Sequence, residues 1–320
     1  MDFWLTDDQR ELQDGIRSFV HGRFPLEEIA EREETAAVID PAKWREIGEM
    51  GVFSLRSDGF DNRSAVLAFE ELGRGLVPGP LVVTHLAAGF VDGAAEGTAI
   101  VSMLEEGTGP TLVEHATQAT DLVRFTDGGV ERIDPSRLSF VSVRRPLDAL
   151  TPVSTIAGGS TEGAPLAGAD ARALWLAGVV FTAALQVGTA AAAVDLATAY
   201  AMEREQFGRP IGSFQAVKHL LAEMFVKSDV ARSAVHAAAC ALDGAAGHDP
   251  VRAASVAKVT AGDAALFCGK TGIQVHGGMG FTWEVHAQRY WKRAVVLDNN
   301  FGSADHHARL VAEMISSEAS

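Results

Sequence analysis

Apolar residues recur with a helical period near the start of the chain. Thr6 to Gln9 has the form of a capping box, in which the first and last side chains each satisfy a free backbone N–H at a helix start. Apolar residues then follow at i, i+4, i+7 and i+8, namely Leu12, Ile16, Phe19 and Val20. Asp40 and Pro41 predict another helix start, because the N–H that proline lacks has no partner in a first turn. Residues 1–97 are therefore predicted to form an N-terminal helical domain, with Trp44, Ile47 and Met50 on the buried side of the second of these helices.

The pattern changes to short runs rich in β-branched residues between residues 98 and 165. These runs are Ala99–Leu104, Leu122–Phe125, Val130–Ile133 and Leu138–Val143. Asp127, Gly128 and Gly129 separate two of them and predict a hairpin, because glycine tolerates the positive φ of tight turns. The glycine-rich stretch from Gly158 to Gly163 is expected to be a flexible surface loop. Residues 98–165 are thus predicted as a small β domain.

Residues 166–320 are expected to be helical throughout. Asp170 can cap a long helix whose stretch between Arg172 and Asp195 contains no charged residue. Because small residues dominate this stretch, we favour a central helix surrounded by protein; a membrane-spanning helix is the less favoured alternative. Ser213 is expected to cap the next helix, and Asp249 with Pro250 to start the one after it.

Composition excludes several classes of function. The 320 residues contain 27 Lys and Arg against 42 Asp and Glu, a formal net charge of -15. Nucleic acids and anionic membrane surfaces are therefore unsuitable partners, because phosphate binding requires clustered cations. Cys240 and Cys268 are the only cysteines, which argues against a disulfide framework and fits a reducing, cytoplasmic setting. The acidic residues between Met1 and Val20 interrupt any apolar core of a signal peptide.

The usual catalytic and metal-binding patterns are weak in this sequence. His219 and Glu223 lie one turn apart but offer too few ligands for a metal. Adjacent His306 and His307 point about 100° apart on a helix, so a capping role for the segment after Asp305 is favoured over an ion site. His276 is expected to be a packed imidazole with its hydrogen bonds satisfied. No metal site is predicted.

Two segments differ from this background. In the stretch from Arg204 to Gln215, an arginine near a helix end is followed by Phe207, a glycine, a proline and a new helix start. Such a segment can bind an anion. The guanidinium can donate two hydrogen bonds to one phosphate, and the free N–H groups at a helix N-terminus attract the same negative charge. In the stretch from Gln274 to Phe281, paired glycines allow a ligand to approach the backbone closely.

Together, in this order, these segments resemble those of the acyl-CoA dehydrogenase family. The match lies in Arg-x-x-Phe-Gly…Phe-Gln from Arg204 and Gln-x-x-Gly-Gly-x-Gly-Phe from Gln274, with weaker matches at the opening helix, Trp44–Gly51 and Glu70–Gly73. The resemblance implies a mainly α fold with an N-terminal helical domain, a reduced middle β domain and a C-terminal four-helix bundle. It also implies FAD-dependent α,β-desaturation of an acyl-CoA, with FAD spanning a subunit interface. By position, the residues that hold the ADP end of FAD are Arg204, Gln206, Phe207, Gln274, Gly277 and Gly278.

The sequence departs from the family where proton abstraction takes place. The usual glutamate base falls on Phe301, and the alternative location for the base falls on Gly178. A positioned base contributes about 10²–10⁴-fold to rate, so its loss is a major change. Asp298 and Asp305 lie near Phe301, with solvated or capping roles favoured for both. The family's Thr-Glu-Pro…Gly-Ser-Asp and Trp-Ile-Thr-like segments, which contact flavin and thioester, are not found in the middle region.

These departures predict the shorter subunit of a heteromeric acyl-CoA dehydrogenase, similar to the two-chain members of bacterial steroid breakdown. Flavin, substrate and base then lie in a full-length partner, usually in an α2β2 heterotetramer, and Phe301 fills the vestigial acyl pocket. An electron-transfer flavoprotein is the usual electron acceptor in the family. Two alternatives stay open: a self-sufficient homo-oligomeric dehydrogenase with a non-standard base such as Asp298, and a non-catalytic acyl-CoA-binding or assembly scaffold.

Overall fold

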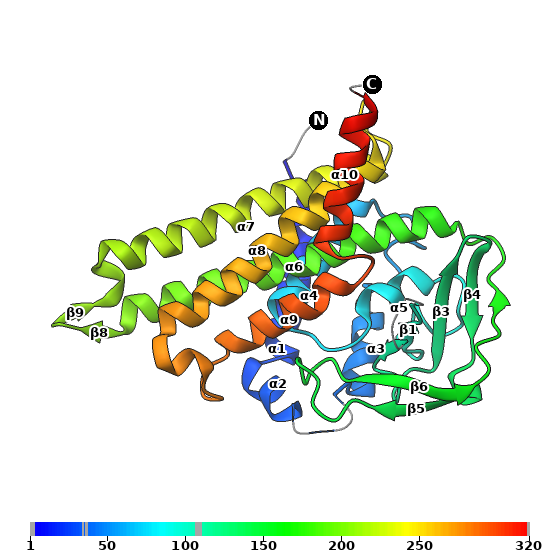
Figure 1. Ribbon diagram of the computed structural model, residues 1–320, viewed down its shortest axis with the longest axis horizontal. Helices are drawn as coiled ribbons and strands as arrows, with labels where there is room; N and C mark the ends of the chain where they lie inside the picture. Colours follow the sequence, from blue (N-terminus) through cyan, green and yellow to red (C-terminus); the bar gives the residue numbers. More distant parts are fainter. Residues whose placement is uncertain (1–3, 34, 36–37, 106–110, 319–320) are drawn as a thin grey trace. The chain divides into compact units, whose positions relative to one another are not determined.

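The computed structural model describes residues 4–33, 35, 38–105 and 111–318 (Figure 1). The chain forms two compact units. The first comprises Met1–Leu26, Val66–Val77 and Val179–Ser320, and the second comprises Glu27–Ala65 and Pro78–Gly178. The division into domains 1–97, 98–165 and 166–320 stays a prediction.

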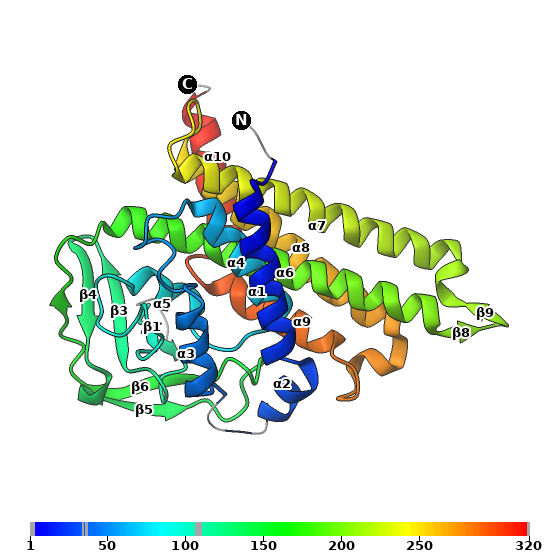
Figure 2. The ribbon, with the colours of Figure 1, turned by 180° about the vertical axis from the view of Figure 1, so that it is seen from behind.

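The first unit is helical and contains the candidate site. Its elements are α1 (Asp7–Arg23), the second half of α4 (Asn62–Arg74), most of α6 (Ala171–Glu203), α7 (Gln215–Leu242), α8 (Pro250–His276), α9 (Ala287–Asn299) and α10 (Ala304–Glu318). Figures 1 and 2 show α7 and α8 running side by side, with a small hairpin of β8 (Glu205–Gln206) and β9 (Arg209–Pro210) beyond the end of α6. The expected helical bundle is confirmed, but the expectation of helix alone after Asp170 is wrong at this hairpin.

Local capping explains where these helices begin. The capping box of α1 is present, with Thr6 Oγ1 accepting from Gln9 N–H and Gln9 Oε1 accepting from Thr6 N–H, each at 3.2 Å. Asp249 Oδ1 accepts from Val251 N–H at 2.8 Å at the start of α8. Asp170 Oδ1 accepts from Ala173 N–H at 3.0 Å at the start of α6. These three predicted helix starts are confirmed, because the side chains that set them are local in sequence.

Helix α6 lies inside protein. Within the described residues it is the one helix long and apolar enough to cross a membrane, but 94% of its most apolar window is buried. A Cβ added at Gly188 would overlap the Glu70 carbonyl oxygen, and one at Gly73 would overlap the Leu185 carbonyl oxygen, so α4 and α6 pack backbone against backbone. The Phe69 and Phe181 rings stack between the same two helices with centroids 5.2 Å apart. The favoured interpretation, a buried core helix, is therefore confirmed.

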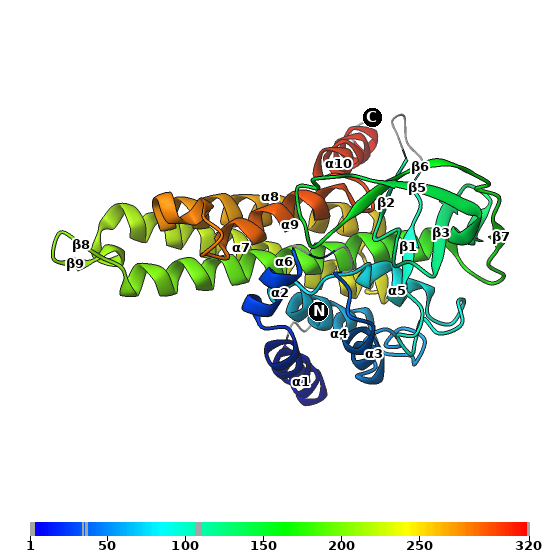
Figure 3. The same cartoon turned by 90° about the horizontal axis from the view of Figure 1, so that it is seen from below.

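The second unit carries short helices and two small sheets (Figure 3). Its elements are α2 (Leu26–Arg32), α3 (Pro41–Glu49), α5 (Leu81–Ala87), β1 (Val101–Met103), β2 (Leu112–Glu114), β3 (Asp121–Thr126), β4 (Gly129–Ile133), β5 (Leu138–Ser142), β6 (Val153–Gly159) and β7 (Ala164–Pro165). Strand orders are β1-β3-β4-β7 and β2-β6-β5. The predicted hairpin is confirmed, since Thr126 pairs with Gly129 across Asp127 and Gly128.

Two expectations about local structure are wrong. Gly158 and Gly159 belong to β6, where they pair with Ser139 and Leu138, so the expected loop begins two residues later. Pairing with a strand some 20 residues earlier overrides the preference of glycine for turns. Met50 lies beyond the end of α3 and is exposed, whereas Trp44 and Ile47 are buried as expected.

The buried imidazole of His85 on α5 predicts a loss of stability in acid. His85 Nδ1 donates to the Val52 carbonyl at 2.9 Å, and burial lowers the pKa of His85 from 6.5 to about 4. Between these values the unfolded chain takes up a proton that the folded chain does not bind. The free energy of unfolding therefore falls as pH decreases from about 6.5 toward 4, by about 3 kcal/mol from this group.

Urea unfolding at several pH values between 7 and 4.5 measures this slope. The matched variant is His85→Asn, which keeps a donor near Nδ1 but does not titrate in this range. We expect the variant to lose stability less steeply than the wild type as pH falls. If the free energy of unfolding falls equally steeply with pH in the variant and in the wild type, His85 does not contribute to the loss of stability in acid.

Candidate functional site

The first predicted site segment forms a tight hairpin after α6. Arg204 N–H donates to the Tyr200 carbonyl at 2.8 Å, and Ile211 N–H donates to the Arg204 carbonyl at 2.7 Å, which closes the hairpin. Phe207 and Gly208 form its two-residue turn with φ of 53° and 75°. Two positive φ angles are typical of a type I′ turn, which joins antiparallel strands with the correct twist. A phenylalanine in this conformation is uncommon, and such backbone strain concentrates at functional sites.

The hairpin exposes its side chains to solvent. Phe207 is 93% exposed, and its ring edge contacts Phe214 at a centroid distance of 6.2 Å. The Arg209 guanidinium lies 4.1 Å from the centroid of the same Phe214 ring. Gln206 is exposed, and its side-chain amide donates to the Glu205 carbonyl at 2.8 Å. The Arg204 guanidinium is also exposed and makes no hydrogen bond or ion pair with another residue that the structure describes.

The predicted capping role of Ser213 is wrong. Ser213 lies in a 3₁₀ turn, Ile211–Ser213, and α7 starts at Gln215 with Phe214 in the N-cap position and no side-chain cap. The bond from Ile211 N–H to the Arg204 carbonyl fixes the chain before it reaches Ser213, and the helix starts one residue later than expected. The local anion-attracting group is therefore the guanidinium of Arg204, without a hydroxyl cap beside it.

The second predicted site segment lies at the end of α8. Gly277 ends the helix with φ 62° and ψ -140°, and a 3₁₀ turn, Gly277–Phe281, follows. A Cβ added at Gly277 or Gly278 would meet no atom within 4 Å, so the backbone is open to an approaching ligand. The Gln274 side chain is exposed, and its amide has no hydrogen-bond partner within the described part of the chain.

A ring stack joins the two segments. The Tyr200 and His276 rings stack with centroids 4.2 Å apart. His276 is buried, as predicted, and its Nδ1 donates to the Gly272 carbonyl at 2.7 Å. Because Tyr200 lies one turn before Arg204 and His276 directly precedes Gly277, this stack brings all six predicted site residues to one end of the bundle (Figures 1 and 2).

The position predicted for the base carries a buried aromatic side chain. Phe301 is 1% exposed and has φ 56°. Its carbonyl accepts from His307 Nε2 at 2.9 Å, so His307 Nδ1 accepts from the Ser255 hydroxyl at 3.1 Å. Burial lowers the pKa of His307, which favours this neutral form. Lys258 Nζ donates to the Leu297 carbonyl at 2.6 Å, which anchors the preceding end of α9.

The nearby acidic residues have structural positions. Asp298 Oδ1 accepts from Ala304 N–H at 3.2 Å and so caps α10. Asp305 lies in the first turn of α10, and exposed His306 and buried His307 point to different surroundings. Both favoured roles, capping and solvation, are confirmed. Among the described residues, no group of three or more His, Cys, Asp or Glu side chains can hold a metal ion.

Comparison with known proteins identifies the family. Models of the acyl-CoA dehydrogenase N-terminal and C-terminal domains match residues 6–96 and 179–316. The acyl-CoA dehydrogenase IpdE2 of Mycolicibacterium smegmatis is 30% identical over 314 residues, which cover 91% of this chain and 93% of the relative. This chain belongs to the acyl-CoA dehydrogenase family.

Solved acyl-CoA dehydrogenases share the fold of this chain. The ChsE4–ChsE5 complex of Mycobacterium tuberculosis gives a TM-score of 0.84 at 21% identity and covers 99% of both chains. A steroid acyl-CoA dehydrogenase complex, Tcur3481–Tcur3483, gives 0.82 at 21% identity, covering 98% of this chain and 99% of that chain. The family consists of flavoprotein oxidoreductases whose cofactor is FAD.

The exposed end of the bundle fits part of an FAD molecule. Arg204 offers an exposed cation for a pyrophosphate, and Gln274 offers an amide for polar groups of a ribose or an adenine. Gly277 and Gly278 leave the backbone open beside them.

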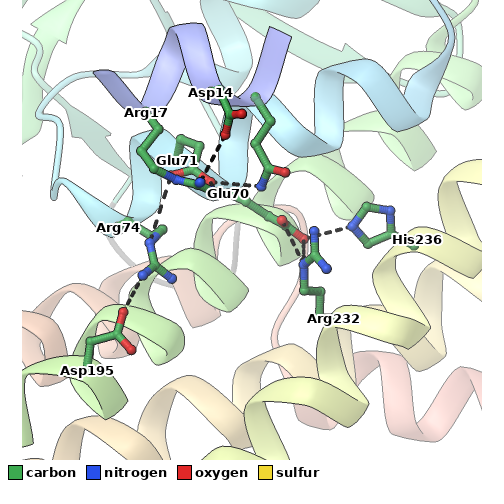
Figure 4. A network of polar contacts seen from close by, with 9 residues as sticks. Asp14, Arg17, Glu70, Glu71, Arg74, Asp195, Arg232 and His236 are labelled. Atoms are coloured by element: carbon green, nitrogen blue, oxygen red, sulfur yellow. Dashed lines mark hydrogen bonds and ion pairs between the residues drawn. The ribbon is translucent and has the colours of Figure 1, made fainter. Parts of the chain in front are cut away.

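One buried network escaped the sequence analysis. Glu70 and Glu71 are both buried on α4 (Figure 4). Glu70 accepts from Arg232 Nε at 3.0 Å and from His236 Nε2 at 3.0 Å, both on α7. Glu71 accepts from Arg17 Nη2 at 2.8 Å on α1. The signal in the sequence was a pair of adjacent acids directly after the apolar run from Ala65 to Phe69, but their partners lie far away along the chain.

Proposed function

We propose that this chain is the shorter subunit of a heteromeric acyl-CoA dehydrogenase and holds the ADP end of an FAD bound mainly by a full-length partner. The observation that carries the proposal is that exposed Arg204 and the open backbone at Gly277 and Gly278 lie at the same end of the bundle. Their exposure suits a cofactor that is held mainly by another subunit.

Each residue at this end has a role that its surroundings support. The Arg204 guanidinium pairs with a phosphate, since a charge-assisted bidentate contact is about twice as strong as a neutral hydrogen bond. Gln274 hydrogen-bonds the nucleoside part, and the two glycines allow its close approach. Phe207 and Gln206 border this contact from the hairpin. FAD supplies the oxidation of the acyl-CoA by accepting a hydride, and the chain's own residues bind and orient the nucleotide.

The missing base supports a partner-dependent reaction. Phe301 occupies the position at which the family usually has its glutamate, and its burial supports our proposal that it fills the vestigial acyl pocket. Asp298 Oδ1 accepts from Ala304 N–H at the start of α10, which favours a structural role for this carboxylate over that of a base. We therefore assign proton abstraction to the glutamate of the partner, in an α2β2 arrangement.

The relatives support a class of substrate and partner. Two of the structures with this fold are two-chain complexes, and one of them is a steroid acyl-CoA dehydrogenase. We propose a bulky, steroid-derived acyl-CoA as substrate, a cytoplasmic setting and an electron-transfer flavoprotein as electron acceptor. The three-domain division remains part of this proposal.

Co-expression with a full-length family member that carries the glutamate tests the proposal. We expect this chain alone to be colourless and inactive. The co-purified complex is expected to carry FAD and to reduce it on addition of acyl-CoA. A yellow, active protein from this chain alone would instead favour the self-sufficient dehydrogenase, and co-expression without flavin or activity would favour the scaffold.

A further inference from the structure

The helical unit contains a cavity that the proposed function does not use. It has a volume of about 260 Å³ and is lined by Leu5, Asp229, Arg232, Ser233 and His236. Four of these residues lie on consecutive turns of α7, and Leu5 directly precedes the cap of α1. Asp229 lies about four turns of helix from the start of α7, so the cavity is remote from the Arg204 hairpin.

The buried carboxylate of Glu70 orients two of the lining side chains. Arg232 Nε lies 3.2 and 3.0 Å from the two Glu70 oxygens, and His236 Nε2 lies 3.0 Å from Oε1 (Figure 4). The two terminal nitrogens of Arg232 have no hydrogen-bond partner among the residues described here. His236 is 7% exposed, its Nε2 donates to Glu70, and its Nδ1 has no partner among the described residues.

Side chains of both charge signs line the cavity, and no ion pair between them is found among the described residues. Asp229 and Arg232 are three residues apart on one face of α7, yet the described ion pairs of Arg232 go to Glu70 alone. The Asp229 carboxylate and the Ser233 hydroxyl are exposed and make no hydrogen bond with another described side chain. The cavity therefore offers donors at Arg232 and Ser233, and acceptor oxygens at Asp229.

We propose that this cavity binds a small zwitterion, an α-amino acid with an aliphatic side chain. The carboxylate of the ligand accepts from Arg232 and Ser233, and its ammonium donates to Asp229. Leu5 forms an apolar wall for the side chain. An anion without an ammonium is disfavoured because it meets Asp229, and a cation without a carboxylate is disfavoured because it meets Arg232. The volume lies below the range typical of drug-sized ligands, which fits a molecule of this size.

Three probes of nearly equal shape test the proposal. They are leucine, 4-methylpentanoate, which lacks the ammonium, and 3-methylbutylamine, which lacks the carboxylate. Calorimetric titration of the full chain is expected to detect leucine binding, with both analogues at least about ten-fold weaker, since each lost charged hydrogen bond costs about 10- to 100-fold in affinity. Equal binding of all three probes, or no binding of leucine at millimolar concentration, would overturn the proposal.

Variants on the exposed surface of α7 then assign the binding to this cavity. Asp229→Asn is expected to weaken leucine at least about ten-fold and to bring 4-methylpentanoate level with it, because the charge that rejects a plain carboxylate is gone. Ser233→Ala is expected to weaken both carboxylate ligands about equally. Glu223→Gln is the matched control, since it removes the same charge from an exposed position of α7 outside the cavity.

Leucine affinity of Glu223→Gln is expected to equal that of the wild type. If Asp229→Asn and Glu223→Gln change binding to the same extent, the effect is one of net charge and the cavity is not the site. Thermal unfolding of each variant checks that the fold is kept.

Discussion

Replacing Arg204 with alanine is expected to lower the FAD content of the co-expressed complex at least about ten-fold. Arg204 is exposed on the hairpin and its guanidinium has no partner among the residues that the structure describes, so it is available for a phosphate on another subunit. Inside an interface such a contact is shielded from water, where a hydrogen bond to a charged group contributes about 1.5–3 kcal/mol. Flavin absorbance per complex after gel filtration measures the loss, and titration of the stripped complex with FAD gives the change in Kd.

Two further variants sharpen this result. Arg204→Lys keeps the positive charge but loses the two-pronged geometry, so an intermediate FAD content is expected. Arg309→Ala removes an exposed arginine of α10, away from the hairpin, and is expected to retain full FAD content. Unchanged flavin content in Arg204→Ala would contradict the proposed function, whereas equal loss in Arg309→Ala would point to a general effect of charge on assembly.

Replacing Glu70 with alanine is expected to lower the free energy of unfolding by about 3 kcal/mol. Glu70 is 3% exposed and pairs with Arg232 and with buried His236. Removing one partner of a buried ion pair costs about 3–5 kcal/mol, because the groups left behind are desolvated without compensation. Arg232 is partly exposed and can recover water, which places the expected loss at the lower end of this range.

Urea unfolding at neutral pH measures this change. Glu318→Ala serves as the control, because Glu318 pairs with Arg252 at the surface and such pairs contribute about 0–1 kcal/mol. Glu70→Gln retains the shape and one acceptor, so its expected loss lies between the other two. A loss below 1 kcal/mol in Glu70→Ala would show that the pairs around Glu70 are replaced by water at little cost.

Much of the fold was predictable because its signals are local. Asp170, Asp249 and the Thr6–Gln9 box set helix starts through bonds within three residues. The hairpin across Asp127 and Gly128 depends on two adjacent residues in the same way. Asp298 was expected to cap or to face solvent, and it caps α10 six residues later.

The errors arose where distant residues compete with local preference. Gly158 and Gly159 pair with β5 instead of forming a loop. Ser213 is not the N-cap of α7, because the hydrogen bond from Ile211 N–H to the Arg204 carbonyl closes a hairpin directly before it. In both places, backbone hydrogen bonds to another segment outweighed the tendency of a single residue.

The sequence by itself identified the family, through the spacing around Arg204 and Gln274. It also supplied the proposed site residues and the proposal that Phe301 replaces the carboxylate. Tertiary structure alone decided that these two segments share one exposed end, through the Tyr200–His276 stack. It also decided that Glu70 is neutralised from α7, 162 and 166 residues further along the chain. The physical reason is the same in each case: ring stacking and burial of charge depend on distances in space, and spacing along a chain does not record them.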